Sequence, residues 1–553
     1  MPPALWPADP NGPALLELTL GDLLDRQAEA FADRPAVTVD DRSKDLLTTW
    51  TYAMLRADAD RLARGLIGWG VAAGDRVAVM APNCAEWVLL EYALAKVGAV
   101  LVTVNPALKR SELAYVLTQG QVSGLFAVTG YRGSDIAADL AALAADLPSL
   151  TRLCRIGEGE MAGALSFADL LALGDRTSDS LRAARQAAVN PRDVAQIQYT
   201  SGTTGKPKGA MLRHHGTVNN ARLMADRGGY GPGDTMLSAM PLFHTAGCVC
   251  NVMAMAASGG HLVTMDAFDP ARMLALWAQF RPSLVNAVPT MMVRMLEHPD
   301  WSAAPRALRR VVTGGTSIPP SLMLQMREQT GGEPLIIMGM TECSPIITQT
   351  RDSDSLETRV GTAGTPLPHT ELRIADPETG ATKALGEAGE LCIRGYLTMA
   401  GYFDMPEKTA ETIDADGWLH SGDLAVLEET GHLRIVGRLK DMIIRGGENV
   451  YPVELEECLL DHPAVSQAQV VGVPDPDLGE ESCAFVVLRE GAQATPEALQ
   501  AHCRQHMARH KMPKYVQVLG ELPMTANGKI QKFALRQQAA AAIADGSLRP
   551  VRA

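Results

Sequence analysis

One glycine-rich segment, Tyr199-Thr-Ser-Gly-Thr-Thr-Gly-Lys-Pro-Lys-Gly209, concentrates residue types that suit phosphate binding. Its eleven residues include four Ser or Thr hydroxyls, three glycines and two lysines. Glycine lets the backbone approach a ligand closely, and N–H, hydroxyl and ammonium groups all donate to phosphate oxygens. A flexible Ser/Gly linker would not need the tyrosine, both lysines and the proline in this order. We therefore predict a polyphosphate-binding loop with ligand contacts from Thr200, Ser201, Gly202, Thr203, Thr204, Gly205, Lys206 and Lys208.

The spacing excludes a Walker A loop, which has more residues between its glycines and a Ser or Thr after its lysine. The chain has 50 basic and 63 acidic residues, a net charge of −13, which disfavours nonspecific binding to nucleic acid or an anionic membrane. A nucleotide would therefore be neutralised locally, by a few basic residues and a metal ion. Nine cysteines without a C-x-x-C pair fit the reducing cytoplasm. We expect no signal peptide and no membrane span.

Helix-like and strand-like segments alternate in the first part of the chain, which favours an α/β fold with parallel layers. The 553 residues suggest several structural units, because one domain has about 150 residues. The predicted helices are 52–69, 85–97 and 136–147, and the predicted strands are 76–80, 99–104 and 124–129.

The texture of the sequence changes near 437–440, where Gly- and Thr-rich turns give way to a compact α+β pattern. We predict a large multi-subdomain N-terminal domain, residues 1–438, and a small C-terminal domain, residues 439–553. The Ala-rich tail from Gln537 onward is expected to fray. The elements predicted in the small domain are helices 453–460 and 496–508 and strands 465–473, 482–488 and 515–519.

Several further segments resemble, in order and over nearly the whole chain, the motifs of the adenylate-forming (ANL) superfamily, which includes the acyl-CoA synthetases and AMP-dependent ligases. Each is weak alone, but their shared order makes coincidence a poor explanation. Besides the glycine-rich loop they are Met240–His244, Thr313–Thr316, Met338–Glu342, Gly417–Asp423, Gly437–Asp441, Ile444–Pro452 and Pro523–Ile530. The resemblance implies an ATP-binding N-terminal domain and a mobile C-terminal domain.

The resemblance also implies roles for single residues around ATP. Glu342 would be the acid linked to Mg²⁺, which prefers carboxylate and phosphate oxygens, and Thr341 a phosphate-contacting hydroxyl. Asp423 and Arg438 would hold the ribose hydroxyls. Met338 stands where the family usually has an aromatic residue, and it can cover a base face only by dispersion. The segments that would enclose adenine and the α-phosphate supply Gly314, Gly315, Thr316, Met338, Gly339 and Met340.

Catalysis is assigned by the resemblance to Lys529 in the C-terminal motif. A carboxylate that approaches the α-phosphate is repelled by about 1 kcal/mol at about 4 Å in water and by several at a partly desolvated site. One ammonium that bridges both groups offsets this repulsion. Alone, Asn-Gly-Lys is also a good hairpin turn. Lys440 would be the hinge of the small domain, and Gly446 and Gly447 would line the tunnel for the pantetheine arm of coenzyme A.

The acyl pocket would lie beside His244, which the resemblance places between acyl group and nucleotide. Residues 245–248 are all small, and 285–292 lack aromatic residues, which suggests a roomy apolar pocket for a bulky hydrophobic carboxylic acid. CoA is the expected acceptor. A carrier-protein thiol, an enzyme that stops at the acyl-adenylate, and a nucleotide sensor remain alternatives. The predicted assembly is a monomer or homodimer.

Overall fold

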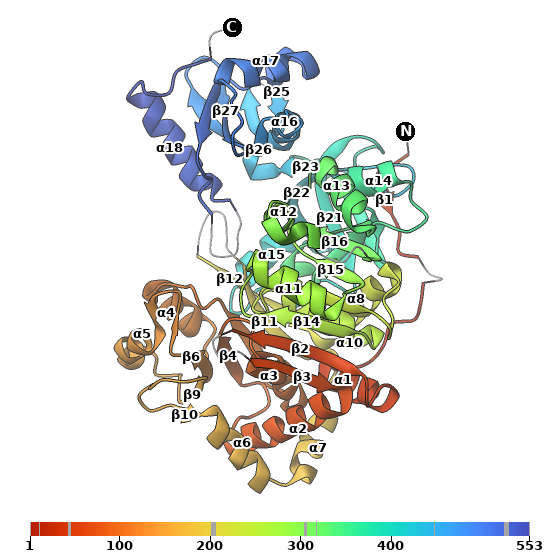
Figure 1. Cartoon of the computed structure of the whole chain (residues 1–553), viewed down its shortest axis with the longest axis vertical. Coiled ribbons are helices and arrows are strands. Elements are labelled where there is room, and N and C mark those ends of the chain that lie inside the picture. Colours follow the sequence, from red (N-terminus) through yellow and green to blue (C-terminus); the bar gives the residue numbers. More distant parts are fainter. Residues whose placement is uncertain are drawn as a thin grey trace.

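The computed structural model describes residues 2–9, 12–42, 46–200, 206–303, 307–316, 318–446, 448–524 and 530–551. Figure 1 shows a large body made of the N-terminal four-fifths of the chain and a smaller unit, coloured blue, at one end. The fold is therefore mixed α/β with a large N-terminal and a small C-terminal domain, as predicted.

A seven-stranded sheet has the order β10-β9-β6-β4-β5-β11-β12, and its edge pair β11 and β12 flanks the glycine-rich segment in sequence. Its neighbours are parallel except for the last pair, β11 and β12. Short apolar runs followed by helices produce this arrangement, as the alternation predicted. The strands are β4 (Arg76–Met80), β5 (Val100–Val104), β6 (Gly124–Val128), β9 (Arg152–Ile156), β10 (Leu165–Ser166), β11 (Val194–Thr200) and β12 (Lys208–Arg213).

A nine-stranded sheet, β19-β18-β17-β16-β15-β13-β14-β2-β3, has a parallel centre and antiparallel edges. The parallel strands β16 and β17 end in the two predicted adenine segments, so both segments lie at one edge of the sheet. The strands are β2 (Pro35–Asp41), β3 (Leu46–Thr51), β13 (Thr235–Ser238), β14 (His261–Met265), β15 (Leu284–Asn286), β16 (Arg310–Gly314), β17 (Glu333–Gly339), β18 (Ile346–Gln349) and β19 (Thr365–Pro366).

Helices pack on both faces of these two sheets. Val77 and Val79 of β4 face the largest core cluster, while Ala78 and Met80 face another, because side chains alternate along a strand. The main helices are α1 (Leu20–Ala30), α2 (Tyr52–Gly68), α3 (Ala85–Val97), α4 (Arg110–Gln119), α5 (Ile136–Leu143), α6 (Phe167–Arg176), α7 (Asp179–Ala187), α8 (His214–Gly228), α10 (Ala254–Ser258), α11 (Pro270–Phe280), α12 (Pro289–Leu296), α13 (Pro320–Thr330), α14 (Leu356–Gly361) and α15 (Pro406–Thr412).

A third, antiparallel sheet completes the large body and leads to the small domain. Its last strand ends at Arg438, and the 3-10 turn η5 (Leu439–Asp441) follows directly. The strands, in sheet order, are β1 (Leu5–Trp6), β20 (Thr370–Ala375), β21 (Ala388–Gly395), β22 (Leu419–Leu427) and β23 (Leu433–Arg438).

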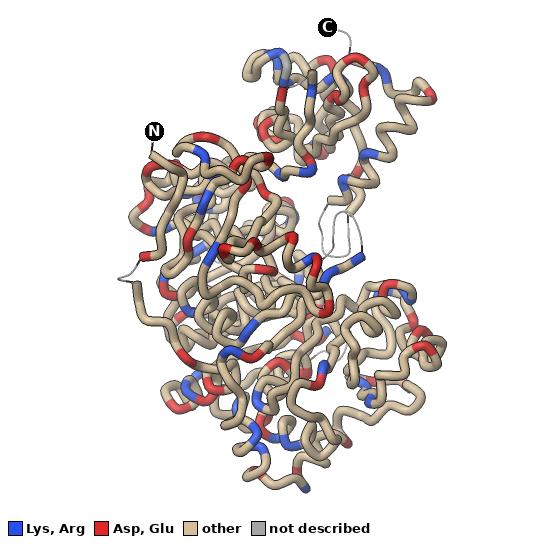
Figure 2. The backbone as a smooth tube through the Cα atoms, turned by 180° about the vertical axis from the view of Figure 1, so that it is seen from behind, with Lys and Arg blue, Asp and Glu red and all other residues tan. Residues whose placement is uncertain are grey.

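The small domain has a five-stranded sheet covered by three helices. One expectation was wrong: the Ala-rich tail is helical to Ala544 because Leu535 and Ala539 are fully buried against the sheet. In Figure 2 basic and acidic residues are interspersed over both domains. The elements are β24 (Ile443–Arg445), β25 (Glu448–Val450), α16 (Pro452–Leu460), β26 (Val465–Asp475), β27 (Gly479–Leu488), α17 (Pro496–His506), β28 (Tyr515–Leu519) and α18 (Lys532–Ala544).

Candidate active site

The base of the predicted phosphate loop is held by strand pairing. Thr200 at the end of β11 lies opposite Lys208 at the start of β12, and Ser201–Gly205 lie outside the described residues. Helix α4 supports this base, because the Tyr115 hydroxyl donates to the Pro207 carbonyl at 3.0 Å. Lys206 Nζ lies 5.1 Å from the centre of the Tyr115 ring. Both lysines of the predicted phosphate-binding segment therefore lie at its base, Lys206 next to helix α4 and Lys208 at the start of strand β12.

Lys208, Glu342 and Tyr402 form one group, called here the Glu342 cluster. The Tyr402 hydroxyl donates to Glu342 Oε1 at 2.8 Å, and Lys208 Nζ lies 4.1 Å from the centre of the Tyr402 ring. Glu342 is 7% exposed. Burial lowers the pKa of Lys208, and the charge of Glu342 opposes that shift. The cluster combines an ammonium with a shielded carboxylate, as a metal–phosphate site requires.

Backbone pairing brings Tyr402 to this position. Phe403 N donates to the Gly209 carbonyl at 2.8 Å, and Met211 N donates to the Gly401 carbonyl at 3.0 Å. The segment that carries Tyr402 thus runs beside β12, which carries Lys208. The sequence analysis missed Tyr402, because the pairing joins residues almost two hundred positions apart and no predicted motif includes it.

The Glu342 carboxylate fits a magnesium ligand. It follows β17 in the short 3-10 turn η4 (Thr341–Cys343), and its own carbonyl accepts from Met399 N at 2.8 Å. These contacts fix a hard, anionic oxygen donor beside a cationic lysine, which is the donor chemistry that Mg²⁺ takes with phosphate oxygens. Thr341, the predicted phosphate-contacting hydroxyl, is the preceding residue and is 9% exposed.

Asp423, Arg438 and Lys440 form a second group, the Asp423 cluster. Asp423 and Arg438 face each other on β22 and β23, with Arg438 Nε 3.1 Å from Asp423 Oδ1. Burial raises the pKa of Asp423, and Glu342 adds to that rise, so the two clusters are within electrostatic reach. Burial and then the charge of Arg438 lower the pKa of Lys440 to about 8. The structure thus brings both predicted ribose ligands together beside Lys440, the predicted hinge residue.

The predicted adenine segments are close-packed at their glycines. A Cβ at Gly314 would lie 2.2 Å from the Ile337 carbonyl oxygen, and one at Gly339 would lie 2.1 Å from the Pro345 carbonyl oxygen. Backbone packing alone therefore requires glycine at both positions. Gly315 has φ +81° and, with Thr316, is exposed. Met338 and Met340 are half-buried and pack against one core cluster.

His244 begins the short helix α9 (Thr245–Gly247) and accepts through Nδ1 from Ala246 N at 3.2 Å. Asn83 anchors the preceding segment, because its Oδ1 accepts from Leu242 N at 2.7 Å and its Nδ2 donates to the Met240 carbonyl at 3.0 Å. The π-helix η2 (Cys248–Met253) follows, a helix type that is frequent at functional sites.

Two observations refine the expected apolar acyl wall. Gly247 is small because a Cβ there would lie 2.2 Å from the Pro241 carbonyl oxygen. Polar side chains also occur in this wall: Gln198 Nε2 donates to Cys248 Sγ at 3.1 Å, and Asn286 Nδ2 donates to Asn251 Oδ1 at 2.6 Å. The small residues therefore reflect packing as well as any space for a ligand.

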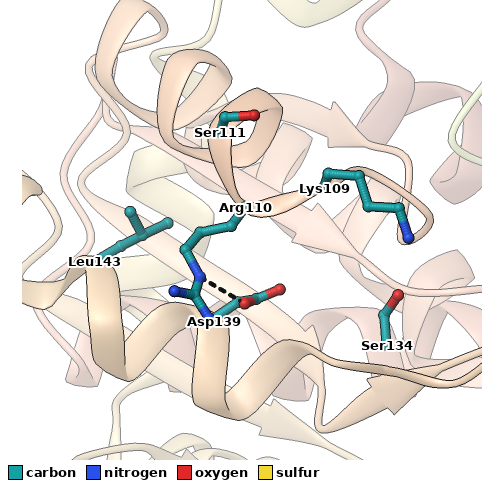
Figure 3. A pocket seen from close by; sticks show the side chains of 6 residues that line it. All are labelled: Lys109, Arg110, Ser111, Ser134, Asp139 and Leu143. Atoms are coloured by element: carbon teal, nitrogen blue, oxygen red, sulfur yellow. Dashed lines mark hydrogen bonds and ion pairs between the residues drawn. The ribbon is translucent and has the colours of Figure 1, made fainter.

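A shallow surface pocket lies between α4 and α5 (Figure 3). Arg110 Nε pairs with Asp139 Oδ1 there at 2.7 Å, and Lys109 N donates to Glu112 Oε2 at 2.8 Å. None of the residues predicted for the site lines it. The pocket is lined by Lys109, Arg110, Ser111, Ser134, Asp139 and Leu143.

Comparison with known proteins decides the family. The model of the AMP-binding enzyme family matches residues 24–403, and that of the AMP-binding enzyme C-terminal domain matches residues 454–529. The chain belongs to this adenylate-forming family. The enzyme is 40% identical over 539 residues to YngI of Bacillus subtilis (strain 168), which covers 95% of this chain and 97% of that protein.

Other similar proteins identify the reaction class. The enzyme is 37% identical over 546 residues to the mitochondrial medium-chain acyl-CoA ligase ACSF2 of Rattus norvegicus, with 95% of this chain and 88% of the relative covered. The crystal structure of the anthranilate CoA ligase AuaEII with anthranoyl-AMP matches with a TM-score of 0.86 and 29% identity, covering 96% of this chain and 99% of that one. The enzyme is therefore an AMP-forming acyl-CoA ligase.

Not every predicted site residue of this AMP-binding enzyme can be placed. Gly447 and Lys529 lie outside the described residues, as does the 201–205 loop. Gly446 has φ +59°, a conformation that favours glycine. Met524 and Ile530 pair as an isolated antiparallel bridge.

Among the described residues, no helix combines the length and the apolar character that a membrane span needs.

Proposed function

We propose that this ligase uses ATP to convert a bulky hydrophobic carboxylic acid into an acyl-adenylate, with release of pyrophosphate, and then transfers the acyl group to CoA with release of AMP. The proximity of the Glu342 and Asp423 clusters carries the proposal. One offers an ammonium and a carboxylate suited to phosphate and Mg²⁺, and the other offers a carboxylate and a guanidinium suited to ribose hydroxyls. A nucleoside triphosphate presents both groups in one molecule.

In the first half-reaction, a carboxylate oxygen of the acid attacks the α-phosphorus of ATP. The bond to the β-phosphate oxygen breaks, and pyrophosphate leaves with the electron pair. Lys206, Lys208 and the 200–205 loop bind the β- and γ-phosphates, while Gly314–Thr316 and Met338–Met340 enclose adenine and the α-phosphate. Lys529 bridges the two anionic reactants. Glu342 would hold a Mg²⁺ ion, which would neutralise phosphate charge.

In the second half-reaction, the thiol of CoA attacks the acyl carbon and AMP departs with the mixed-anhydride oxygen. The small domain, residues 439–553, turns about Lys440, which removes Lys529 and presents Gly446 and Gly447 to the pantetheine arm. His244 lies between acyl group and nucleotide. This division assigns Lys529 to the first arrangement of the two domains and Gly446 and Gly447 to the second.

The substrate class is supported by the names of the relatives. The rat relative is a medium-chain acyl-CoA ligase, and the solved ligase acts on anthranilate, an aryl acid. Both acids are larger and less polar than acetate. We place the enzyme's substrate in this medium-chain or aryl class, and its compartment in the cytoplasm, where its nine free, buried cysteines stay reduced.

A panel of acids tests the proposal, with AMP and thioester measured with and without CoA. The expected result is AMP and acyl-CoA from medium-chain or aryl acids, at a rate at least about tenfold above that with acetate. AMP without a thioester would instead favour a carrier-protein acceptor or an enzyme that stops at the acyl-adenylate. Preference for acetate or an α-amino acid would overturn the substrate class, and absence of AMP would overturn the activity and leave a sensor.

A further inference from the structure

A cluster of Glu390, Cys392 and His420 lies on β21 and β22, beside the Asp423 cluster. Cys392 and His420 are partners in the antiparallel register, which shifts between Glu390 and Cys392. Such a bulge re-aims side chains. It places Glu390 Oε2 2.8 Å from His420 Nδ1 and Cys392 Sγ 3.6 Å from the same nitrogen. None of the three residues has a role in the proposed mechanism.

The second oxygen of Glu390 holds the turn that leads to Asp423. Gly422 N donates to Glu390 Oε1 at 3.1 Å, and Gly422 has φ +69°. Next to it, Asp423 N donates to Ser421 Oγ at 3.0 Å, and Ser421 Oγ donates to the Leu391 carbonyl at 2.7 Å. One carboxylate therefore contacts residues one and three positions before the predicted ribose ligand.

The other side of the His420 ring is also fixed. Its Nε2 lies 3.4 Å from Asp414 Oδ2, and Asp414 Oδ1 accepts from Trp418 N at 2.8 Å. With a carboxylate at each ring nitrogen, the orientation of the imidazole is determined from both sides. These contacts thus connect three segments that precede Asp423 in the chain, through Glu390 on β21, Asp414 before β22 and His420 on β22.

A metal site is the rival interpretation, because one donor atom from each of Glu390, Cys392 and His420 lies within 4.8 Å of the others. Two observations disfavour it. Arg373, a cation, lies 3.6 Å from Asp414 Oδ2 and also hydrogen-bonds to Cys392. In addition, Glu390 Oε2 and Cys392 Sγ already contact His420 Nδ1, at 2.8 Å and 3.6 Å, so the three donor atoms satisfy one another.

We propose that Glu390 and His420 are positioning residues that set the Asp423 carboxylate for the ribose hydroxyls. The inference rests on the proposed role of Asp423 in ATP binding. A carboxylate that accepts from two hydroxyls must be oriented toward both, and Glu390 holds the Gly422 turn that directly precedes it. Loss of Glu390 should therefore weaken recognition of the ribose hydroxyls rather than the chemistry at phosphorus.

The test compares ATP with its 2′-deoxy and 3′-deoxy analogues in steady-state kinetics with one accepted acid. Glu390→Ala is expected to raise the KM for ATP about tenfold, with a smaller change in kcat, and to reduce the preference for ATP over the deoxy analogues. Asp423→Ala should reduce the same preference. The double variant should discriminate no less than Asp423→Ala alone, since both residues act through one contact.

Two further variants keep the test independent of folding. Glu390→Gln retains an acceptor for Gly422 N and should recover part of the discrimination. Glu371→Ala is the matched control, because Glu371 on neighbouring β20 also forms an ion pair, 2.8 Å from Arg394, away from Asp423. It should lose stability without loss of discrimination. Thermal unfolding of each variant separates the two effects.

The outcomes are distinguishable. Unchanged discrimination in Glu390→Ala, or additive losses in the double variant, would overturn the inference while the proposed function stands. Stoichiometric zinc in the purified enzyme that disappears in Cys392→Ala would also overturn it, in favour of a metal site. A wild-type enzyme that forms AMP with no acid would overturn the proposed function itself.

Discussion

The Glu342 and Asp423 clusters face the same proposed nucleotide but are built differently. The Glu342 cluster joins segments of the large domain through backbone pairing, and its carboxylate is 7% exposed. The Asp423 cluster lies on the last two strands of a sheet, and its Arg438 side chain is 53% exposed. Directly after Arg438 the chain turns into the small domain.

We infer from this difference that the Glu342 cluster has a fixed geometry, while the geometry of the Asp423 cluster depends on the position of the small domain. Met442 and Tyr451, in the first part of the segment predicted as the small domain, pack against apolar residues of β22 and β23, namely Leu424, Val426 and Val436. A turn of the small domain would therefore disturb the neighbourhood of the Asp423 cluster and leave the Glu342 cluster in place. The geometry of the Glu342 cluster would persist through both half-reactions, while the ribose contacts of the Asp423 cluster would respond to the position of the small domain.

The largest effect is expected for Lys529→Ala, which tests whether the small domain supplies a group that neither cluster has. Adenylation should fall about 10²–10³-fold, because one preorganised charge at the transition state is removed. Thioester formation from preformed acyl-adenylate should change far less. Single-turnover assays of each half-reaction measure the two rates separately.

Lys511→Ala is the matched control, since Lys511 lies in the same domain and pairs with Glu454. It should leave both half-reactions within about twofold of wild type. Equal losses in both half-reactions of Lys529→Ala would contradict the alternation and place the small domain beside the Asp423 cluster throughout the cycle.

Tyr402→Phe tests whether the Glu342 cluster is preorganised. It removes one hydrogen bond to a buried carboxylate, worth about 1.5–3 kcal/mol. The concentration of Mg²⁺ at half-saturation should rise about tenfold at fixed ATP, because the Glu342 oxygen loses its fixed position. Discrimination between ATP and its deoxy analogues, which belongs to the Asp423 cluster, should stay unchanged.

Tyr396→Phe provides the control for this prediction. The Tyr396 hydroxyl accepts from Asn220 Nδ2 at 3.3 Å, whereas the Tyr402 hydroxyl donates to Glu342. The Tyr396→Phe substitution should lower the free energy of unfolding by about 1 kcal/mol, while the Mg²⁺ concentration at half-saturation should stay unchanged. A shift of the same size in both variants would mean that general destabilisation, rather than Glu342, sets metal binding.

The two clusters also differ in how much of them the sequence could predict. Asp423 and Arg438 lie in short motifs close to the change of texture near 437–440, although no strand was predicted at either residue. The helix over 85–97 and the strand over 76–80 have their predicted bounds because local apolar spacing defines them. Tyr402 could not be predicted, because its contact with Glu342 spans 60 positions and depends on non-local strand pairing.

Two glycines show a second limit of prediction from sequence, because their spatial neighbours cannot be inferred from a motif. Gly314 and Gly339 were interpreted as space for a base, and packing against Ile337 and Pro345 is a sufficient reason for them. A glycine in a motif does not reveal whether a ligand or another backbone is its neighbour. Similarly, the tail after Gln537 was judged by composition, while contacts of Ala539 with a distant sheet make it helical.

Lys440→Met tests the Asp423 cluster through the pH dependence of the free energy of unfolding. The folded pKa of Lys440, about 8, lies below the unfolded value near about 10.4. Below pH 8 Lys440 is charged in the folded state, where burial and the charge of Arg438 disfavour that charge, so the Met variant should be more stable than wild type. Between about pH 8 and 10.4 the unfolded chain binds more protons, so wild type gains stability and the difference shrinks. Denaturant unfolding at pH 7 and pH 10 measures it, and a constant difference would contradict the shift.

The smallest effect is expected for Lys408→Ala, at the edge of the Glu342 cluster. Lys408 pairs with Glu411 at 2.7 Å, is 54% exposed, and its charge adds to the lowering of the Lys208 pKa. Removing an exposed charge of this kind changes free energies by less than about 0.5 kcal/mol. The KM for ATP should therefore change less than about twofold and become insensitive to the mutation above about 0.5 M salt. A larger, salt-resistant change would show that the fixed cluster extends to α15, and that its boundary is not set by burial.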